Sequence, residues 1–358
     1  MRHRESLSPG QRMKPTKPIV YLGIDCGATT SKIGGIDGEG EILGDELRQS
    51  ETRGNDGPAA MIAGWLSGAD GYLEEHRLGW ERVAGVGLAI PGPYREHGVL
   101  GRQPNLPKTL EGWPFLRDLT AAVADAAGRP VPVATANDGQ LAGLAEARVI
   151  QATRPGSVVM LAPGSGLGGA YVGADGRLLA GDRDAAAILG HLPAPCGRLG
   201  LPVFSCGCGR DWGCFEAYTA IAGLPQFIAH FAPDFPDHPF ARLPGPGKSE
   251  ALRLRGLARD GDPLALAIFD KQAEAMGYAV ATACMAYDPT HVVIGGGLID
   301  PGATSPGFRK RYMDGIRAAA GRYGWSPIEN LTFHEARLGE LSQAIGAALI
   351  ARNAATGC

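Results

Sequence analysis

Short, fully apolar runs alternate along this chain with longer segments whose apolar residues recur at helical spacing. The runs Ile19–Ile24 and Val83–Ile90 are apolar and partly β-branched, which is typical of buried strands. Apolar residues between positions 59 and 76 follow the period of an amphipathic helix. The turn residues Asp37–Gly40 indicate a hairpin, so we expect strands on both sides of it, at Lys32–Ile36 and Glu41–Leu47.

The same order of elements begins again near residue 158. A strand at Val158–Leu161 runs into the glycine turn Pro163–Gly169, and a return strand is expected at Ala170–Val172. Two halves that each open with a strand, a glycine-rich turn and a hairpin suggest a duplication, and ligands in such α/β architectures bind between the halves. We expect the other helices at Phe115–Ala127, Gln140–Arg148, Glu216–Phe231, Glu250–Asp260, Pro263–Tyr287 and Leu341–Arg352, the other strands at Val131–Thr135 and His291–Ile294, and a surface loop at Ala232–Lys248.

The composition of the 358 residues argues against several classes of protein. An apolar fraction of 44% is ample for buried cores, whereas a formal net charge of −3 provides no electrostatic basis for binding nucleic acid or an anionic membrane. No apolar run approaches the length of a membrane span, and no signal peptide is evident, so we expect a cytoplasmic protein. The polar, basic segment Met1–Pro18 is predicted to be a disordered tail, too short for a helix-turn-helix domain.

One imidazole and three thiols lie close together in the sequence, at His191, Cys206, Cys208 and Cys214. Four nitrogen and sulfur ligands with none left for water suit a closed, structural zinc site. The alternative is a group of buried thiols, or a disulfide between Cys214 and one of the other two cysteines. Seven cysteines in 358 residues are too few for a disulfide scaffold, so we favour the metal.

Two glycine turns could bind phosphate. Gly164-x-Gly166-x-x-Gly169 matches the dinucleotide fingerprint in spacing, but a strand follows where that fingerprint requires a helix. A turn between strands can still present backbone N–H groups to phosphate oxygens, with Ser165 adding a hydroxyl. The turn Asp25–Thr30 offers the same geometry plus a carboxylate that could hold Mg²⁺ through water. Together the two turns predict one triphosphate that is bound from both sides. At Gly295-Gly296-Gly297 the backbone is expected to approach the ligand closely a third time, beside the nucleoside.

The motifs in their order are Asp25-x-Gly-x-Thr, Pro91-Gly92-Pro93, Asn105, Asn137-Asp138, the Gly164–Gly169 turn, Gly190-His191, the cysteine cluster and Gly295-Gly296-Gly297. In this combination the chain resembles the ROK family of bacterial sugar kinases and sugar-responsive repressors, from about Ile19 to its C-terminus. The resemblance implies an α/β fold of two similar ribonuclease H-like domains, of the actin/hexokinase type, with ATP and sugar in the interdomain cleft. Many members are dimers or tetramers, and we expect a homodimer.

The resemblance also implies a division of the chain. We expect residues 19–138 to form the N-terminal α/β domain and residues 139–340 a C-terminal α/β domain that carries the zinc knot. Residues 341–358 are expected to form a helix that returns to the N-terminal domain, and residues 1–18 the disordered tail.

Roles for individual residues follow from the same resemblance. Asp138 matches the catalytic base that accepts a proton from a sugar hydroxyl while ATP, with Mg²⁺, donates its γ-phosphoryl group. The other residues fall into three groups: the sugar ligands are Asn105, Asn137, Asp138, His191 and Glu216; the ATP ligands are Asp25, Gly27, Thr29, Thr30, Gly164, Ser165, Gly166, Gly168, Gly295, Gly296 and Gly297; and the zinc ligands are His191, Cys206, Cys208 and Cys214.

Two positions depart from the family pattern. Ile188 stands where a glutamate usually contacts the sugar, which indicates a different substrate or weakened sugar binding, and Arg210-Asp211-Trp212 lengthens the cysteine loop by one residue. Three alternatives therefore stay open. Asp138 could be an ordinary helix N-cap, the chain could be a sugar-binding sensor without catalysis, or its cysteines could hold the iron–sulfur cluster of a dehydratase-activator type of ATPase.

Overall fold

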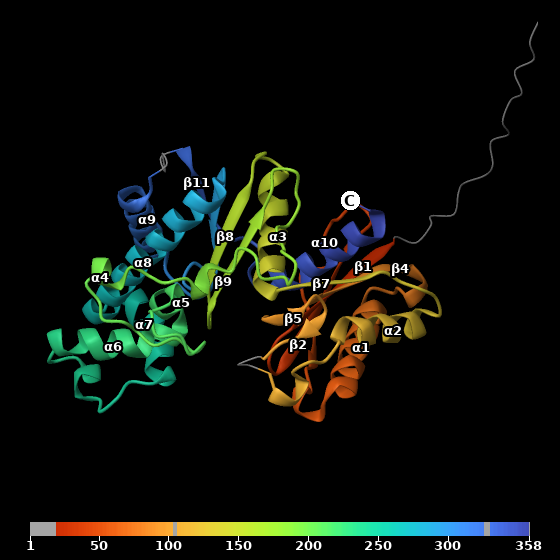
Figure 1. Cartoon of the computed structure of the whole chain (residues 1–358), viewed down its shortest axis with the longest axis horizontal. Coiled ribbons are helices and arrows are strands. Elements are labelled where there is room, and N and C mark those ends of the chain that lie inside the picture. The colour runs from red at the N-terminus through yellow and green to blue at the C-terminus, as the bar shows by residue number, and fades with distance from the viewer. Residues whose placement is uncertain (1–18, 103–105, 326–329, 358) are drawn as a thin grey trace, which may run out of the picture.

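A computed structural model describes residues 19–102, 106–325 and 330–357, and it shows two α/β halves side by side (Figure 1). The first half is built on a five-stranded sheet in the order β3-β2-β1-β4-β7. Its central strand pairs antiparallel with β2 and parallel with β4. The strands are β1 (Val20–Cys26), β2 (Thr30–Asp37), β3 (Arg48–Glu51), β4 (Val83–Ala89) and β7 (Val133–Ala136), and a small hairpin of β5 (Tyr94–Glu96) and β6 (Val99–Leu100) lies beside them.

The second half is built on a four-stranded sheet in the order β11-β10-β8-β9. β8 pairs antiparallel with β9 and parallel with β10, and β10 pairs parallel with β11. The strands are β8 (Val158–Pro163), β9 (Leu167–Val172), β10 (His291–Ile294) and β11 (Thr332–Glu335).

Helices cover both faces of each sheet. The α-helices are α1 (Pro58–Glu75), α2 (Phe115–Ala127), α3 (Asp138–Gln151), α4 (Cys196–Leu199), α5 (Phe215–Thr219), α6 (Leu224–Phe231), α7 (Lys248–Arg259), α8 (Pro263–Tyr287), α9 (Pro306–Tyr323) and α10 (Ser342–Thr356). Short 3₁₀ helices lie at Gly54–Asp56, Trp80–Arg82, Lys108–Leu110, Leu189–His191, Ile221–Gly223, Ala232–Asp234, Pro239–Arg242 and Gly339–Leu341. Among the described residues, no helix is both long and apolar enough to cross a bilayer.

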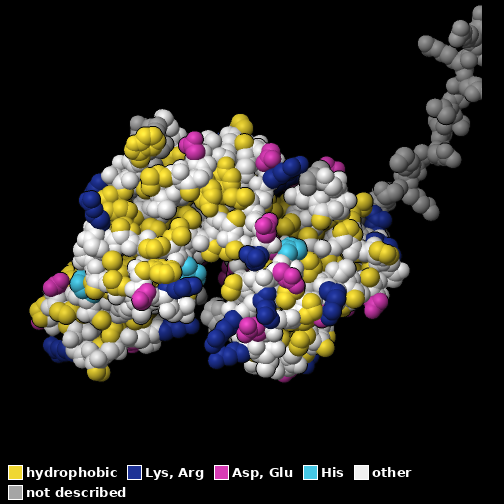
Figure 2. Space-filling view, viewed as in Figure 1, with side chains coloured by type: hydrophobic (Ala, Val, Ile, Leu, Met, Phe, Trp, Pro, Cys, Tyr) yellow, Lys and Arg dark blue, Asp and Glu magenta, His cyan; other side chains and the backbone are white. Residues whose placement is uncertain are grey.

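Alternation of side chains along the strands divides the apolar residues into three cores. In β1, Leu22 and Ile24 pack toward α1 and α2, whereas Tyr21 packs on the opposite face with residues of α10 and α3. Val159 and Leu161 of β8 pack toward α8 and α9. The core that contains α3 and α10 lies between the two sheets, so these two helices join the halves (Figure 1). A notch parts the halves at the lower edge of the molecule (Figure 2).

The predicted bounds of the helices Phe115–Ala127 and Pro263–Tyr287 and of the strand His291–Ile294 are confirmed. The strand predicted at Glu41–Leu47 is wrong. Within it only Ile42 forms an isolated bridge, to Ile36, because Gly44 has a φ of 77° that ends the extended backbone. The paired strand is β3, which follows this segment.

The helix predicted at Glu216–Phe231 is interrupted, since Ala220 is extended between α5 and the next 3₁₀ helix. The predicted surface loop at Ala232–Lys248 contains two 3₁₀ helices, and one of its phenylalanines, Phe240, is buried. The bounds of helix α9, and strand β11, were not predicted.

The returning helix α10 approaches its neighbours so closely that only glycine fits at the contacts. A Cβ on Gly23 or Gly87 of the first sheet would overlap a carbonyl oxygen of α10. A Cβ on Gly346 of α10 would overlap the carbonyl oxygen of Leu141 in α3. The distances between the first sheet, α10 and α3 therefore depend on glycine at these three positions.

We predict that Gly346→Ala destabilises the protein by about 1–3 kcal/mol, because the added methyl group must push α10 away from α3. Gly321→Ala in α9 is the matched control, since no heavy atom lies within 4 Å of its added Cβ. Alanine there should raise stability by about 0.5–1 kcal/mol through its better helix propensity. Denaturant unfolding of both variants measures the difference, and equal behaviour would contradict the close packing of α10.

Candidate active site

The turn between β1 and β2 is tight and is held from outside by Thr52. The N–H of Gly27 donates to the carbonyl oxygen of Thr30 at 3.2 Å. The Thr52 N–H donates to the carbonyl oxygen of Thr29 at 2.9 Å, and the Thr52 hydroxyl donates to the carbonyl oxygen of Gly27 at 2.8 Å. Thr52 is fully buried. These bonds fix the backbone of the turn that the sequence predicts to bind phosphate.

Asp25 lies at the start of this turn, directly across the strand pair from Lys32. Burial, and next the negative charge of Asp138, raise the pKa of Asp25 to about 7, while the charge of Lys32 opposes the shift. The charge of Asp138 therefore acts on Asp25, although 113 positions separate the two residues in the chain. Two carboxylates so placed favour a bound cation between or beside them.

Asp138 is the first residue of α3, and its neighbour Asn137 is the N-cap. The side-chain oxygen of Asn137 accepts from the Gly139 N–H at 3.0 Å, and the side-chain oxygen of Gln140 accepts from the Asn137 N–H at 3.4 Å. Capping therefore rests on Asn137, and the alternative that Asp138 is the cap residue is wrong. Burial raises the pKa of Asp138, although a hydrogen bond from the Gly139 N–H lowers it, which brings the carboxylate nearer the range of a general base.

The glycine turn between β8 and β9 spans Gly164 to Gly166, and a strand follows it, as expected. Glu216 closes this turn from behind, because its Oε2 accepts from the Leu167 N–H at 3.0 Å. A Cβ on Gly166 would collide with the same carboxylate. The N–H groups of Ile221 and Ala222 donate to the carbonyl oxygens of Gly164 and Ser165 at 3.0 and 3.3 Å. These bonds to the turn accompany the interruption between α5 and α6.

The N-terminus of α3 touches the start of β9, directly after this second turn. A Cβ on Gly139 would lie 3.1 Å from the Cα of Gly168 and 3.2 Å from the nitrogen of Gly169. Asp138 is therefore linked to both glycine turns: its neighbour Gly139 contacts the strand that follows the second turn, and its charge acts on Asp25 of the first.

The third glycine run packs against the beginning of the second turn. Gly296 has a φ of 84°, and a Cβ there would overlap the carbonyl oxygen of Pro163. Between Gly164 and Gly297 lies a small pocket that opens to solvent. Its walls are largely apolar and include Ile221, Leu224, Phe269 and Leu298, as is usual for sites of small organic ligands.

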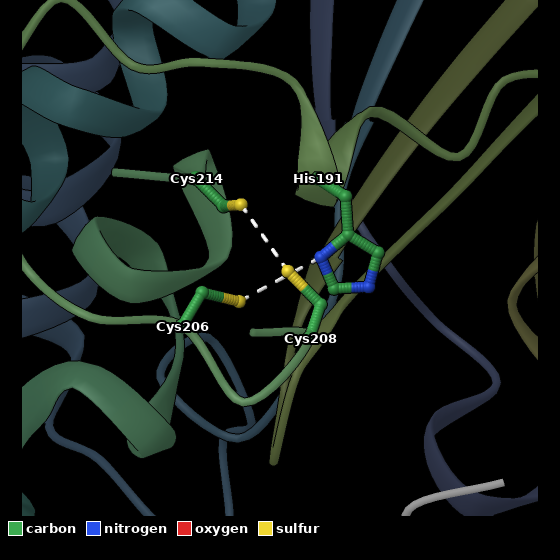
Figure 3. A group of neighbouring side chains, drawn as sticks. All are labelled: His191, Cys206, Cys208 and Cys214. Carbon is green, nitrogen blue, oxygen red and sulfur yellow. Dashed lines mark hydrogen bonds between the residues drawn. The ribbon is translucent and has the colours of Figure 1, made fainter. Parts of the chain in front are cut away.

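The predicted metal ligands converge, as Figure 3 shows. One ligand atom from each of His191, Cys206, Cys208 and Cys214 lies within 4.8 Å of the others. The Cys206 Sγ is 3.7 Å from the His191 Nδ1, and the Cys208 Sγ is 3.6 Å from the Cys214 Sγ. A zinc tetrahedron with Zn–S near 2.3 Å and Zn–N near 2.0 Å has edges of about 3.5–3.8 Å. The four side chains fit zinc, and all three cysteines are free, so the disulfide alternative is not found.

The cysteine cluster is connected to the second glycine turn through Glu216. The Cys206 Sγ donates to Oε1 of Glu216 at 3.5 Å, while the other oxygen of Glu216 holds the turn. Gly190, which precedes His191, lies against Leu167, so that a Cβ on it would come 2.8 Å from the Leu167 carbonyl oxygen. The cluster thus supports one wall of the site from outside.

The structure brings the four predicted metal ligands together and places Glu216 against the second glycine turn, and Asn105 lies outside the described residues. Ile188 is half-buried and precedes the 3₁₀ helix Leu189–His191, so it offers no polar atom from its side chain. Two supporting residues were missed: Thr52, for which the local sequence carries no signal, and Gln140. The position of Gln140, three residues after Asn137, is the spacing of a capping box.

Comparison with known proteins shows the family to which the chain belongs. The glucokinase of Thermotoga maritima is 30% identical over 304 residues, 83% of this chain and 88% of that protein. The N-acetyl-D-glucosamine kinase of Photobacterium profundum is 28% identical over 284 residues, 78% of this chain and 84% of that protein. The crystal structure of a ROK family glucokinase from Streptomyces griseus, in complex with glucose and AMPPNP, superposes with a TM-score of 0.66 at 25% identity and covers 93% of this chain and 99% of that one. Residues 21–354 match the model of the ROK family, and the chain belongs to that family.

Proposed function

We propose that this chain is an ATP-dependent sugar kinase that phosphorylates a hydroxyl group of a hexose, most simply a glucokinase-like enzyme. The observation that carries the proposal is Asp138 at the start of α3, where its neighbour Gly139 lies against Gly168 and Gly169, directly after the second glycine turn, and where its charge acts on Asp25 of the first. The Streptomyces griseus relative, which covers nearly the same length, was crystallised with glucose and an ATP analogue.

The nucleotide is assigned to the glycine turns and the adjoining pocket. The phosphates would meet the backbone of Gly27, Thr29 and Thr30 on one side and of Gly164, Ser165, Gly166 and Gly168 on the other, with Gly295, Gly296 and Gly297 beside the nucleoside. The apolar pocket between Gly164 and Gly297 suits a planar base. Asp25 would hold Mg²⁺ through water, and the ion would neutralise charge on the phosphates when bound.

The acceptor sugar is assigned to Asn105, Asn137, His191 and Glu216, with Asp138 taking the hydroxyl proton as the oxygen attacks the γ-phosphorus. Orientation of the acceptor supplies a large part of the rate. His191 can serve both the metal and the sugar because its Nδ1 faces the sulfur atoms, which leaves Nε2 for a hydroxyl group. Glu216 uses Oε2 for the turn, and Oε1 is released once Cys206 is a zinc-bound thiolate.

Zinc is assigned to His191, Cys206, Cys208 and Cys214 as a structural ion with four protein ligands. We also propose that the chain divides into domains at residues 19–138 and 139–340 and a returning helix at residues 341–358. We further propose that it assembles as a homodimer.

We predict that Asp138→Asn lowers sugar phosphorylation by several orders of magnitude without loss of ATP binding, because the amide cannot accept the proton. The variant keeps the shape of the side chain, and Asn137 still caps the helix, so its melting temperature should not fall. ADP release and sugar phosphate are measured together. Turnover near that of the wild type would remove Asp138 from the mechanism, and wild-type protein that binds sugar without consuming ATP would support the sensor alternative.

A second prediction concerns position 188. Ile188→Glu should lower the KM for glucose by about tenfold, corresponding to the 1–1.5 kcal/mol of one added hydrogen bond to a hydroxyl group. Ile188→Gln is the control for size without charge. An unchanged or higher KM in both variants would show that this side chain does not face the sugar.

A third prediction concerns the metal. Purified protein should contain one zinc per chain, and Cys208→Ser should lose it together with order in the segment 190–216, which then exchanges its amide hydrogens faster. Cys196→Ser is the matched control, because Cys196 is a free, half-buried cysteine outside the cluster. Elemental analysis that finds no metal in the wild type would contradict the assignment.

A further inference from the structure

The hairpin of β5 and β6 begins beside a predicted sugar ligand. The hairpin is entered through the cis peptide bond between Gly92 and Pro93. A Cβ on Gly92 would lie 2.9 Å from the side-chain nitrogen, Nδ2, of Asn137. The hairpin closes through the Gly101 N–H, which donates to the Pro93 carbonyl oxygen at 2.9 Å. His97 lies in its turn, between the two short strands. The hairpin therefore forms an edge of the first half next to Asn137.

The loop at residues 180–188 of the second half leads to another predicted sugar ligand, His191. It is fastened to α3, because Nε2 of Gln140 donates to the carbonyl oxygens of Ala180 and Ala186 at 3.0 and 2.9 Å. Gln140 also takes part in the capping box with Asn137. The loop is thus tied to the same helix terminus that carries Asp138.

One side-chain contact joins this hairpin to this loop. The Nδ1 of His97 lies 2.7 Å from Oδ2 of Asp184. The Asp184 side chain is only 3% exposed, whereas that of His97 is 51% exposed. An imidazole and a carboxylate at this distance form a strong hydrogen bond, which is stronger still when the imidazole is charged.

The chain bears two costs to place a carboxylate at position 184. Its φ of 51° lies in the left-handed region, which glycine adopts without steric strain and other residues adopt uncommonly. Burial also raises the pKa of this carboxyl group, against the opposing effect of His97. A loop that only needed this backbone shape would be better served by glycine. The carboxylate, rather than the backbone, explains aspartate here.

We propose that His97 and Asp184 are positioning residues for the acceptor sugar, forming an imidazole–carboxylate clasp between the β5–β6 hairpin of the first half and the loop 180–188 of the second. The clasp holds the hairpin that lies beside Asn137 and the loop that leads to His191 at a fixed separation. Because Ile188 contributes no hydrogen bond to the sugar, binding depends more on this separation. The sugar-binding consequence rests on the proposed kinase function, whereas the clasp itself does not.

Three variants test the clasp. Asp184→Gly removes the carboxylate and suits the positive φ, so its melting temperature should equal or exceed that of the wild type. His97→Ala removes the imidazole, and His97→Asn keeps a donor nitrogen near the place of Nδ1. Asp184→Gly and His97→Ala should each raise the KM for the sugar about tenfold, the effect of losing roughly 1.4 kcal/mol, with the KM for ATP changed less than about twofold. His97→Asn should restore most of the lost affinity.

The double variant His97→Ala with Asp184→Gly should be no worse than the more affected single variant, because both substitutions remove one shared contact. Additive losses of sugar affinity, or equal changes in the KM for sugar and for ATP, would overturn the proposal. So would a His97→Asn enzyme as impaired as His97→Ala.

Amide hydrogen exchange of the free protein tests the clasp without any turnover. His97→Ala should speed exchange in the loop 180–188 as well as in the hairpin, and Asp184→Gly should speed exchange in the hairpin as well as in the loop. Exchange that changes only around the substituted residue would refute the clasp. If exchange is coupled but the wild type phosphorylates no sugar, the clasp stands, and the proposed function and its sugar-positioning role fail.

Discussion

The contact on which this site depends is made by backbone, with almost no side chains between. Gly139 at the start of α3 lies against Gly168 and Gly169 at the start of β9, so the helix that begins with Asp138 starts beside the strand that follows the second glycine turn. Behind it, Gly346 lets α10 pack against α3, and Gly23 and Gly87 let α10 pack against the first sheet. Glycine at these positions brings the carboxylate and both turns together, because any larger residue would move the layers apart.

The second glycine turn is supported from outside by the cysteine cluster. Glu216 connects the two, since one of its oxygens holds the turn after Gly166 and the other lies near Cys206. Zinc bound by the four ligands would therefore stabilise the second glycine turn without contacting the nucleotide. The His97–Asp184 clasp acts at another edge, where the hairpin of the first half meets a loop of the second.

Local patterns predicted the parts of this site that lie within one turn of chain. Glycine spacing indicated both turns, and the strand–helix junction at Asn137-Asp138 was visible in the sequence. The sequence also carries the helical pattern of α9, because its buried residues Phe308, Tyr312 and Ile316 recur every four positions. The contact of His97 with Asp184 joins residues 87 positions apart, and neither residue has a local partner pattern. The strand expected at Glu41–Leu47 failed because alternation alone does not reveal the positive φ of Gly44.

The central claim is that Asp138 faces both the terminal phosphate of ATP and the acceptor hydroxyl. A crystal structure with glucose, Mg²⁺ and a non-hydrolysable ATP analogue measures this directly. The account predicts a carboxylate oxygen of Asp138 within hydrogen-bonding distance, about 2.6–3.2 Å, of one glucose hydroxyl whose oxygen points at the γ-phosphorus. A nucleotide bound away from the two glycine turns, or a glucose hydroxyl that points away from Asp138, would contradict it.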